Sequence, residues 1–187
     1  RSMRRGHTQA RYLEIIARLR EAVPDLALSS DVIVGYPGES ESEFEDTLSV
    51  LESVGFDSLF VFAYSPRPGT AAALANDDVP SEEKQRRLKL VLDYQQRRQR
   101  EANAARVGEL EDVLVDTLDG GGRVSGRTPH FRIVHFDGDE GLLGRFVKVQ
   151  VSVCQPTTTA SFADTSPVPS ASPNSALATI GIPAAGE

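Results

Sequence analysis

The feature that most constrains the fold is a strand, a Gly-Pro turn and a helix start in immediate succession, in the stretch DVIVGYPGESESEF at residues 31–44. Its β-branched first part is typical of a buried strand, and the helix that follows within a few residues favours an α/β layer. Ser40 and Glu43 stand three residues apart just before Phe44, the spacing of a capping box. We therefore expect an α/β domain built on a parallel sheet.

The flanking segments extend this pattern. Apolar residues at helical spacing follow Thr8, a candidate N-cap, until Pro24 ends the helix. A second apolar strand, DSLFVFAY at residues 57–64, is followed by a loop rich in proline and glycine. A long helix is expected from Ser81 to about Arg106. Helix, strand, helix and strand joined by short links favour parallel strands with right-handed crossovers.

The hydrophobic period changes to two from Val107 onward. Short alternating segments such as LEDVLVDTL and GRFVKVQVSV are separated by DGGG and DGDEG, which predicts a small antiparallel barrel or sandwich. Beyond Gln155 the chain is rich in Ser, Thr, Pro and Ala, with almost no charge and no period, so we expect it to be disordered. The predicted domains are residues 1–106, 107–154 and a tail, 155–187.

Composition narrows the classes of function. The net charge of −7 gives no global sign of binding to nucleic acid or to an anionic membrane, and no apolar run has bilayer length. A soluble, cytoplasmic protein is expected. Cys154 is the only cysteine, so several thiolates of this chain cannot form a disulfide, metal or iron–sulfur site. Because the sequence starts at Arg1 in a basic stretch and its first methionine is Met3, we expect a piece of something longer.

The turn GYPGE occupies the place where parallel sheets bind ligands, at the carboxyl end of a strand. Gly35 and Gly38 would allow positive φ or close approach of the backbone to a ligand, and Pro37 would stiffen the turn. Glu39 could accept a hydrogen bond from a ribose hydroxyl or an amine, or it could complement the helix dipole. The alternative is that the segment is only a turn.

A second loop ends the next strand at the same predicted edge of the sheet. In YSPRPGT, residues 64–70, the backbone and the Ser65 hydroxyl could meet the other side of a nucleoside. The alternative is an ordinary proline-rich loop. Two such loops on adjacent strands together favour a ligand site.

Several segments, in this order and spacing, resemble the carboxyl-terminal half of the radical S-adenosylmethionine methylthiotransferases. They are MRRGHT, SSDVIVGYPGESESEFEDTL, FDSLFVFAYSPRPGTAAA, VPSEEKQRRL and SGRTPHFRIVHF, and the resemblance covers nearly everything from Met3 to Val153. The branch most similar modifies the adenosine next to the tRNA anticodon. The resemblance implies part of a radical SAM (β/α)6 partial barrel, followed by a small RNA-binding β-barrel called a TRAM domain.

The resemblance also implies cofactors and their residues. The adenine and ribose of S-adenosylmethionine would contact Ile33, Gly35, Pro37, Gly38 and Glu39. Tyr64 and Ser65 would lie near the nucleoside, and Arg5 would bind the methionyl carboxylate. The family's [4Fe–4S] clusters need several cysteines, which would lie in an amino-terminal part that is missing here. The resemblance therefore implies no catalytic or metal residue in this chain, which should be inactive alone, and an electron donor for the cluster as a partner.

The barrel segment GRTPHFR would present phosphate contacts and a stacking ring for single-stranded or loop RNA, through Arg127, Thr128, Phe131 and Arg132. Charge argues the other way, because residues 107–154 contain five Lys or Arg against eight Asp or Glu. If the barrel binds tRNA, its basic side chains must cluster on one face, helped by the eight Lys or Arg between Lys84 and Arg106. The alternative is that this helix simply exposes a solvated face.

The leading hypothesis is a part of a methylthiotransferase that adds a methylthio group to C2 of N6-isopentenyladenosine in the tRNA anticodon stem-loop. The alternatives are a sister enzyme acting on a ribosomal-protein aspartate or on threonylcarbamoyl adenosine, and a non-catalytic RNA-binding module. We expect a monomer with no membrane partner. Because an incomplete barrel exposes strand edges and apolar surface, we also expect the chain to have low stability by itself.

Overall fold

The computed structural model describes residue 3 and residues 6–154, 158–164 and 177–179. Its contacts divide the chain into two compact units, Arg1–Arg97 with Ala178–Glu187, and Arg98–Leu177. Each unit is described by itself. Among the described residues, no helix has both the length and the apolar character needed to cross a bilayer.

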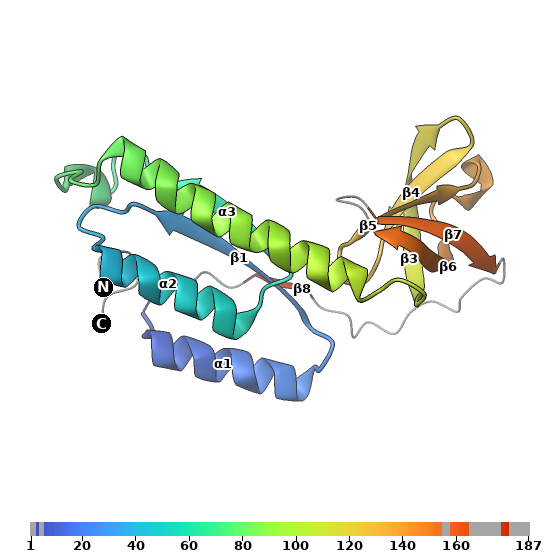
Figure 1. Ribbon diagram of the computed structural model, residues 1–187, viewed down its shortest axis with the longest axis horizontal. Coiled ribbons are helices and arrows are strands. Elements are labelled where there is room, and N and C mark those ends of the chain that lie inside the picture. The colour runs from blue at the N-terminus through green and yellow to red at the C-terminus, as the bar shows by residue number, and fades with distance from the viewer. Residues whose placement is uncertain (1–2, 4–5, 155–157, 165–176, 180–187) are drawn as a thin grey trace. The chain divides into compact units, whose positions relative to one another are not determined.

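The first unit is an α/β layer (Figure 1). Its elements are α1 (Gln9–Ala22), β1 (Ala27–Val34), α2 (Glu41–Val54), β2 (Ser58–Ala63), the 3-10 turn η1 (Ala72–Leu74) and the start of α3 (Ser81–Ala104). Strands β1 and β2 are parallel. The predicted order of helix, strand, helix and strand and the parallel pairing are both confirmed.

Local sequence signals position these elements. Thr8 caps α1, its side chain accepting a hydrogen bond from the Arg11 amide, and α1 ends just before Pro24. The predicted capping box of α2 is present, because the Ser40 side chain accepts from the Glu43 amide while the Glu43 carboxylate accepts from the Ser40 amide. Strand β1 therefore leads into the N-terminus of α2 through a turn of only six residues, residues 35–40.

One face of the sheet carries the core. Side chains of β1 and β2, among them Val32, Val34 and Leu59, pack in one apolar cluster with side chains from all three helices. The opposite face is buried at Ala27 and Ser29 near the start of β1 and exposed toward the carboxyl ends of the strands. There the register sets Asp31 beside Phe60 and Ile33 beside Phe62. Ile33, Phe60 and Phe62 are 38%, 54% and 52% exposed, which agrees with the predicted exposed apolar surface.

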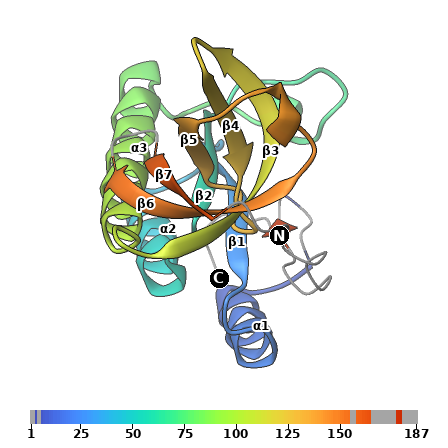
Figure 2. The same ribbon diagram turned by 90° about the vertical axis from the view of Figure 1, so that its right-hand side faces the viewer.

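The second unit contains a five-stranded sheet (Figure 2). Its elements are β3 (Leu110–Gly120), β4 (Arg123–Arg127), β5 (Ile133–Asp137), the 3-10 turn η2 (Glu140–Leu142), β6 (Phe146–Cys154) and β7 (Thr158–Asp164). The strands pair in the order β3-β4-β5-β7-β6, and β6 also pairs with β3, which closes the sheet. Valine residues on alternate positions and Phe136 fill its interior. The predicted second β domain is thus present.

The structure differs from the sequence prediction at three points. The pair β5–β7 is parallel, so the sheet is not wholly antiparallel. Strands β7 and β8 (Leu177–Thr179) lie in the range 155–187, which was predicted to be disordered; β8 joins the first sheet in the order β2-β1-β8. The polar, Thr-rich β7 can pair with the open edges of β5 and β6, because the hydrogen bonds between strands are made by backbone groups. The units divide between Arg97 and Arg98, inside α3, rather than after Arg106.

Candidate functional site

The turn between β1 and α2 has the backbone that the sequence indicated. Gly35 and Gly38 have φ of +70° and +83°, the left-handed region that favours glycine. The Gly35 amide donates to Glu39 Oε2 at 2.5 Å, and the Gly38 amide donates to Asp78 Oδ1 at 2.7 Å. Both amides are therefore satisfied by carboxylates of the chain itself, and the turn is ordered by its own side chains.

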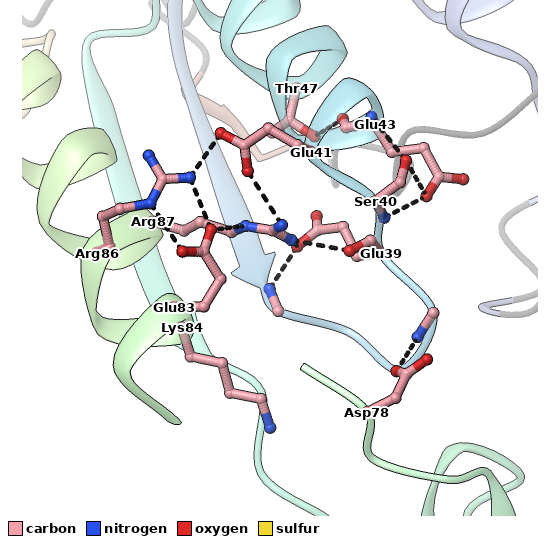
Figure 3. Close-up of polar contacts among 12 residues, drawn as sticks. Glu39, Ser40, Glu41, Glu43, Thr47, Asp78, Glu83, Lys84, Arg86 and Arg87 are labelled. Atoms are coloured by element: carbon pink, nitrogen blue, oxygen red, sulfur yellow. Dashed lines mark hydrogen bonds and ion pairs between the residues drawn. The ribbon is translucent and has the colours of Figure 1, made fainter. Parts of the chain in front are cut away.

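Glu39 is held by a buried arginine from α3 (Figure 3). Arg87 Nη1 lies 2.8 Å from Glu39 Oε2 and 3.0 Å from the Glu39 carbonyl oxygen. The two side chains are 5% and 4% exposed. Arg87 also donates to Glu83 at 2.8 Å and to Glu41 at 3.2 Å. Burial acts to lower the pKa of Arg87, but its hydrogen bonds to Glu39 and Glu83 outweigh burial and raise that pKa above its usual value.

A surface network continues from this pair. Arg86 donates to Glu83 at 2.6 Å and to Glu41 at 2.5 Å, and so links the first turns of α3 and α2 (Figure 3). The hydrogen bonds from Arg86 are the largest cause that lowers the pKa of Glu83 to about 2; burial opposes them, and the hydrogen bond from Arg87 lowers the pKa further. Four charged side chains therefore tie α3 to the helix that follows the GYPGE turn.

Lys84 packs across Gly35. A β-carbon built on Gly35 would stand 2.4 Å from Lys84 Cγ, so no larger residue fits there while Lys84 keeps its place. The Lys84 ammonium bonds both oxygens of Asp77, at 2.6 and 2.7 Å, and lies 5.2 Å from the ring centre of Tyr64. The close approach that the sequence assigned to a ligand at Gly35 is thus made, among the described residues, by a lysine stem.

Tyr64 joins the second predicted loop to the first. Its amide donates to the Val34 carbonyl at 2.8 Å, and its ring meets Tyr36 edge-to-face with the ring centres 5.4 Å apart. Its hydroxyl oxygen is buried and makes no hydrogen bond to any residue in the described part of the chain. Burial, with the charge of Asp77 second, raises the pKa of Tyr64, so the hydroxyl is a neutral donor at pH 7. An unpaired buried hydroxyl is costly and invites a polar ligand atom.

The other predicted residues are distributed around this centre. Ile33 and Gly38 are exposed, Pro37 is half-buried and Ser65 is exposed, all at the carboxyl ends of β1 and β2. Arg5 lies outside the described residues. Sequence reasoning missed Lys84 and Arg87, which it treated only as members of a basic helix. The spacing of Glu83 and Arg87, four residues apart on a helix, was the available signal for their pairing.

These residues fit S-adenosylmethionine in part. Tyr64 offers an unpaired hydroxyl, and the exposed Ile33 offers an apolar surface for an adenine. Glu39 Oε2 is already engaged by Gly35 and Arg87, and the amides of Gly35 and Gly38 are engaged as well. Glu39 is therefore placed to shape the turn. In the described part of the chain, no group of three or more His, Cys, Asp or Glu side chains is arranged to hold a metal.

The predicted RNA residues lie at the end of β4, which is Arg127, and in the turn between β4 and β5, which holds Thr128, Phe131 and Arg132. Arg127 forms an ion pair with Asp116, and its side chain is 49% exposed. Thr128 is buried; its amide donates to the Arg132 carbonyl at 3.0 Å, and its hydroxyl accepts from the Arg132 amide at 3.2 Å. Phe131 is 58% exposed and has φ of +60°, the only positive φ outside glycine among the described residues.

Acidic partners balance much of the positive charge. In the barrel, Lys148 pairs with Asp112 at 2.9 Å, and Arg106 pairs with Glu111 at 2.6 Å. On α3, Lys84 and Arg87 are buried in ion pairs. Of the eight Lys or Arg that were expected to help a basic face, Lys84 and Arg87 are thus engaged in packing around the GYPGE turn.

Comparison with known proteins matches each unit to a family. Residues 1–51 match the Radical SAM superfamily, and residues 104–161 match the TRAM domain. The chain thus combines a segment of a radical SAM domain with a TRAM domain, the class that the sequence predicted.

The similar curated proteins are tRNA-2-methylthio-N(6)-dimethylallyladenosine synthases. That of Alkalilimnicola ehrlichii is 45% identical over 158 residues, 83% of this chain and 35% of the relative. Those of Methylococcus capsulatus and Syntrophotalea carbinolica are both 44% identical, covering 84% and 82% of this chain and 35% of each relative. The chain is therefore similar to these synthases over most of its own length, and it spans about a third of the length of the relatives that it matches.

Proposed function

We propose that this chain is the carboxyl-terminal part of a methylthiotransferase. The whole protein would add a methylthio group to C2 of N6-isopentenyladenosine beside the anticodon, in the cytoplasm, using S-adenosylmethionine. The observation that supports this proposal most is the 45% identity, over 83% of this chain, to a protein named as such a synthase. The succession of a radical SAM segment and a TRAM domain supports it further.

In this proposal the two strand-end loops bind S-adenosylmethionine. Ile33 would lie against the adenine, and the buried Tyr64 hydroxyl would donate to a polar atom of the nucleoside. Gly35, Pro37, Gly38 and Glu39 would form the wall of the site rather than its hydrogen-bonding groups, because the Gly35 and Gly38 amides and the Glu39 carboxylate are engaged within the chain. Ser65 and Arg5 stay candidates, Arg5 for the methionyl carboxylate. The strands β1 and β2 would belong to the (β/α)6 partial barrel.

A [4Fe–4S] cluster would supply the electron that such chemistry needs. Three thiolates cannot come from a sequence that contains Cys154 alone, so in this proposal the cluster ligands, and the contact with an electron donor, lie outside these 187 residues. The chain by itself is then expected to show no methylthiolation.

The test is nucleoside mass spectrometry of tRNA from the source organism with and without the gene. Loss of the 2-methylthio group from N6-isopentenyladenosine, restored by the whole gene, is the expected result. An unchanged adenosine would overturn the substrate assignment. Loss of methylthio from threonylcarbamoyl adenosine, or from a ribosomal-protein aspartate, would support the sister enzymes instead.

The TRAM match supports a role for the second unit in holding the tRNA anticodon stem-loop. Arg127 and Arg132 would contact phosphates, while Phe131 would contact a base. Thr128 is buried, so it would act by shaping the turn through its bonds to Arg132. A gel shift with tRNA at low and high salt tests this, because phosphate contacts make binding salt-dependent. A monomer that binds tRNA without chemistry would support the RNA-binding module.

A further inference from the structure

The outer surface of the barrel carries a row of side chains across four strands. Ile133 of β5 stands opposite Arg127 of β4, Arg127 opposite Leu114 of β3, and Leu114 opposite Phe146 of β6. Side chains of directly opposed residues lie on the same face of a sheet. Their sequence neighbours Val113, Val115, Val134 and Val147 fill the interior, so this outer row faces away from the core.

The outer row has the composition of a surface that stacks bases. Three of its four side chains are apolar, and Ile133 is 45% exposed. The exception is Arg127, an inner member of the row, whose guanidinium forms an ion pair with Asp116. Neutralised in this way, Arg127 offers a planar, oriented guanidinium more than a free charge. This accounts for a barrel that is not basic overall, because stacking and apolar contacts need little net charge.

Phe131 stands in the turn that leads into β5, two residues before Ile133 of this row. A bulky residue at φ +60° is strained, at a cost of order 1–2 kcal/mol. The strain is imposed by the turn, because the Phe131 amide donates to the Thr128 carbonyl at 2.9 Å and the Thr128 amide donates to the Arg132 carbonyl. The ring obtains little burial in return, since Phe131 is 58% exposed. Folding alone therefore does not explain a phenylalanine at this position, where glycine or asparagine would be less strained.

From these observations we infer that Phe131 is a preorganised stacking residue that binds an unpaired base of single-stranded RNA, with the outer row beside it. The inference rests on the proposed RNA-binding role of the barrel. It adds that affinity comes mainly from stacking on a strained aromatic residue and that unpaired bases are preferred to duplex. The turn holds the ring before RNA arrives, so less conformational freedom is lost on binding.

The test measures how tightly the natural chain and three variants bind a short single-stranded RNA that carries 2-aminopurine, and how tightly they bind the matched duplex. Phe131→Asn removes the ring and suits the left-handed backbone. We expect this variant to bind the single strand about tenfold more weakly and not to quench the 2-aminopurine fluorescence. Its melting temperature should equal or exceed that of the natural chain. Phe131→Tyr keeps the ring and should bind like the natural chain. Leu118→Ala, which trims another side chain that is 47% exposed on β3, is the matched control and should change affinity less than twofold.

The possible outcomes distinguish failure of the stacking role of Phe131 from failure of the proposed RNA-binding role of the barrel. If the natural chain binds neither RNA at low salt, the RNA-binding role of the barrel fails, and the inference fails with it. If the chain binds RNA but Phe131→Asn binds equally well while folded, the barrel binds RNA by other residues, and only the stacking role is overturned. The stacking role is overturned as well if the duplex binds as tightly as the single strand. An unchanged or higher melting temperature together with weaker single-strand binding in Phe131→Asn supports the inference.

Discussion

At the scale of single residues, Gly35 and Gly38 share a positive φ but differ in their surroundings. A β-carbon at Gly38 would meet no atom within 4 Å, whereas one at Gly35 would meet the Lys84 stem. We expect Gly38→Ala to lower the free energy of unfolding by about 1–2 kcal/mol through backbone strain alone. Gly35→Ala should lower it by about 1–3 kcal/mol more, because the added methyl group overpacks the site.

Chemical denaturation followed by tyrosine fluorescence measures this difference, because all four tyrosines of the chain lie in the first unit. Lys84→Ala in the Gly35→Ala background removes the clashing stem and should recover part of the loss. Equal losses in the two single variants would show that Lys84 does not constrain Gly35.

Arg87 is expected to be the most sensitive charged residue of the turn. Arg87→Ala would leave the Glu39 carboxylate buried without its cation, at a cost of about 3–5 kcal/mol. The matched control is Lys89→Ala on the same helix, whose pair with Asp93 is 74% and 55% exposed and whose loss should cost less than about 0.5 kcal/mol. If the double variant Glu39→Gln, Arg87→Met were no more stable than Arg87→Ala, the unpaired Glu39 charge would not be the cause of the lost stability.

At the scale of elements, the start of α2 depends on its capping box. The Ser40 hydroxyl accepts from the Glu43 amide at 3.2 Å, and Glu43 Oε2 accepts from the Ser40 amide at 2.7 Å. Ser40→Ala should therefore lower the free energy of unfolding by about 1 kcal/mol. Ser40→Asp keeps an accepting oxygen at the N-cap and should restore most of it. Circular dichroism during denaturation measures both variants.

The link between α3 and α2 should make the first unit sensitive to acid. The pKa of Glu83 is about 2 in the folded chain, below its usual value of 4.5, mainly because Arg86 donates to it. A depressed pKa means that the stabilisation is complete above the unfolded value and is lost as the pH falls from about 4.5 to about 2. Unfolding free energies across this window should fall less steeply in Glu83→Gln than in the natural chain. Equal slopes would contradict the assignment.

At the scale of the whole molecule, the exposed apolar part of the sheet face should limit solubility. Ile33, Phe60 and Phe62 expose apolar surface on the face opposite the helices. We expect the chain alone to melt at low temperature, as the sequence predicted, and its exposed apolar surface to promote non-specific association. Phe60→Thr should reduce light scattering while changing the unfolding free energy by less than about 0.5 kcal/mol, because threonine suits a strand and Phe60 is already half exposed. A chain that melts cooperatively at high temperature would contradict this expectation.

Much of the fold followed from local patterns. The Thr8 cap, the capping box at Ser40 and the apolar periods predicted α1, α2, β1 and β2, because caps and periodicity act within a few residues. Strands of the second unit followed from alternation and glycine turns. Strand β7 did not, because its polar sequence is a strand only beside the open edges of β5 and β6.

The sequence by itself determined the class of the chain, because the order and spacing of the motifs can be read directly from it. It also predicted the candidate site at the ends of β1 and β2. Only the tertiary structure decided what each residue there does. It showed that Glu39 is held by Arg87, that Lys84 occupies the space beside Gly35, and that Tyr64 keeps a buried hydroxyl unpaired within the described chain. These roles depend on side chains some 20–50 residues apart in sequence, such as Glu39 with Arg87 at a separation of 48, and no local pattern encodes such contacts.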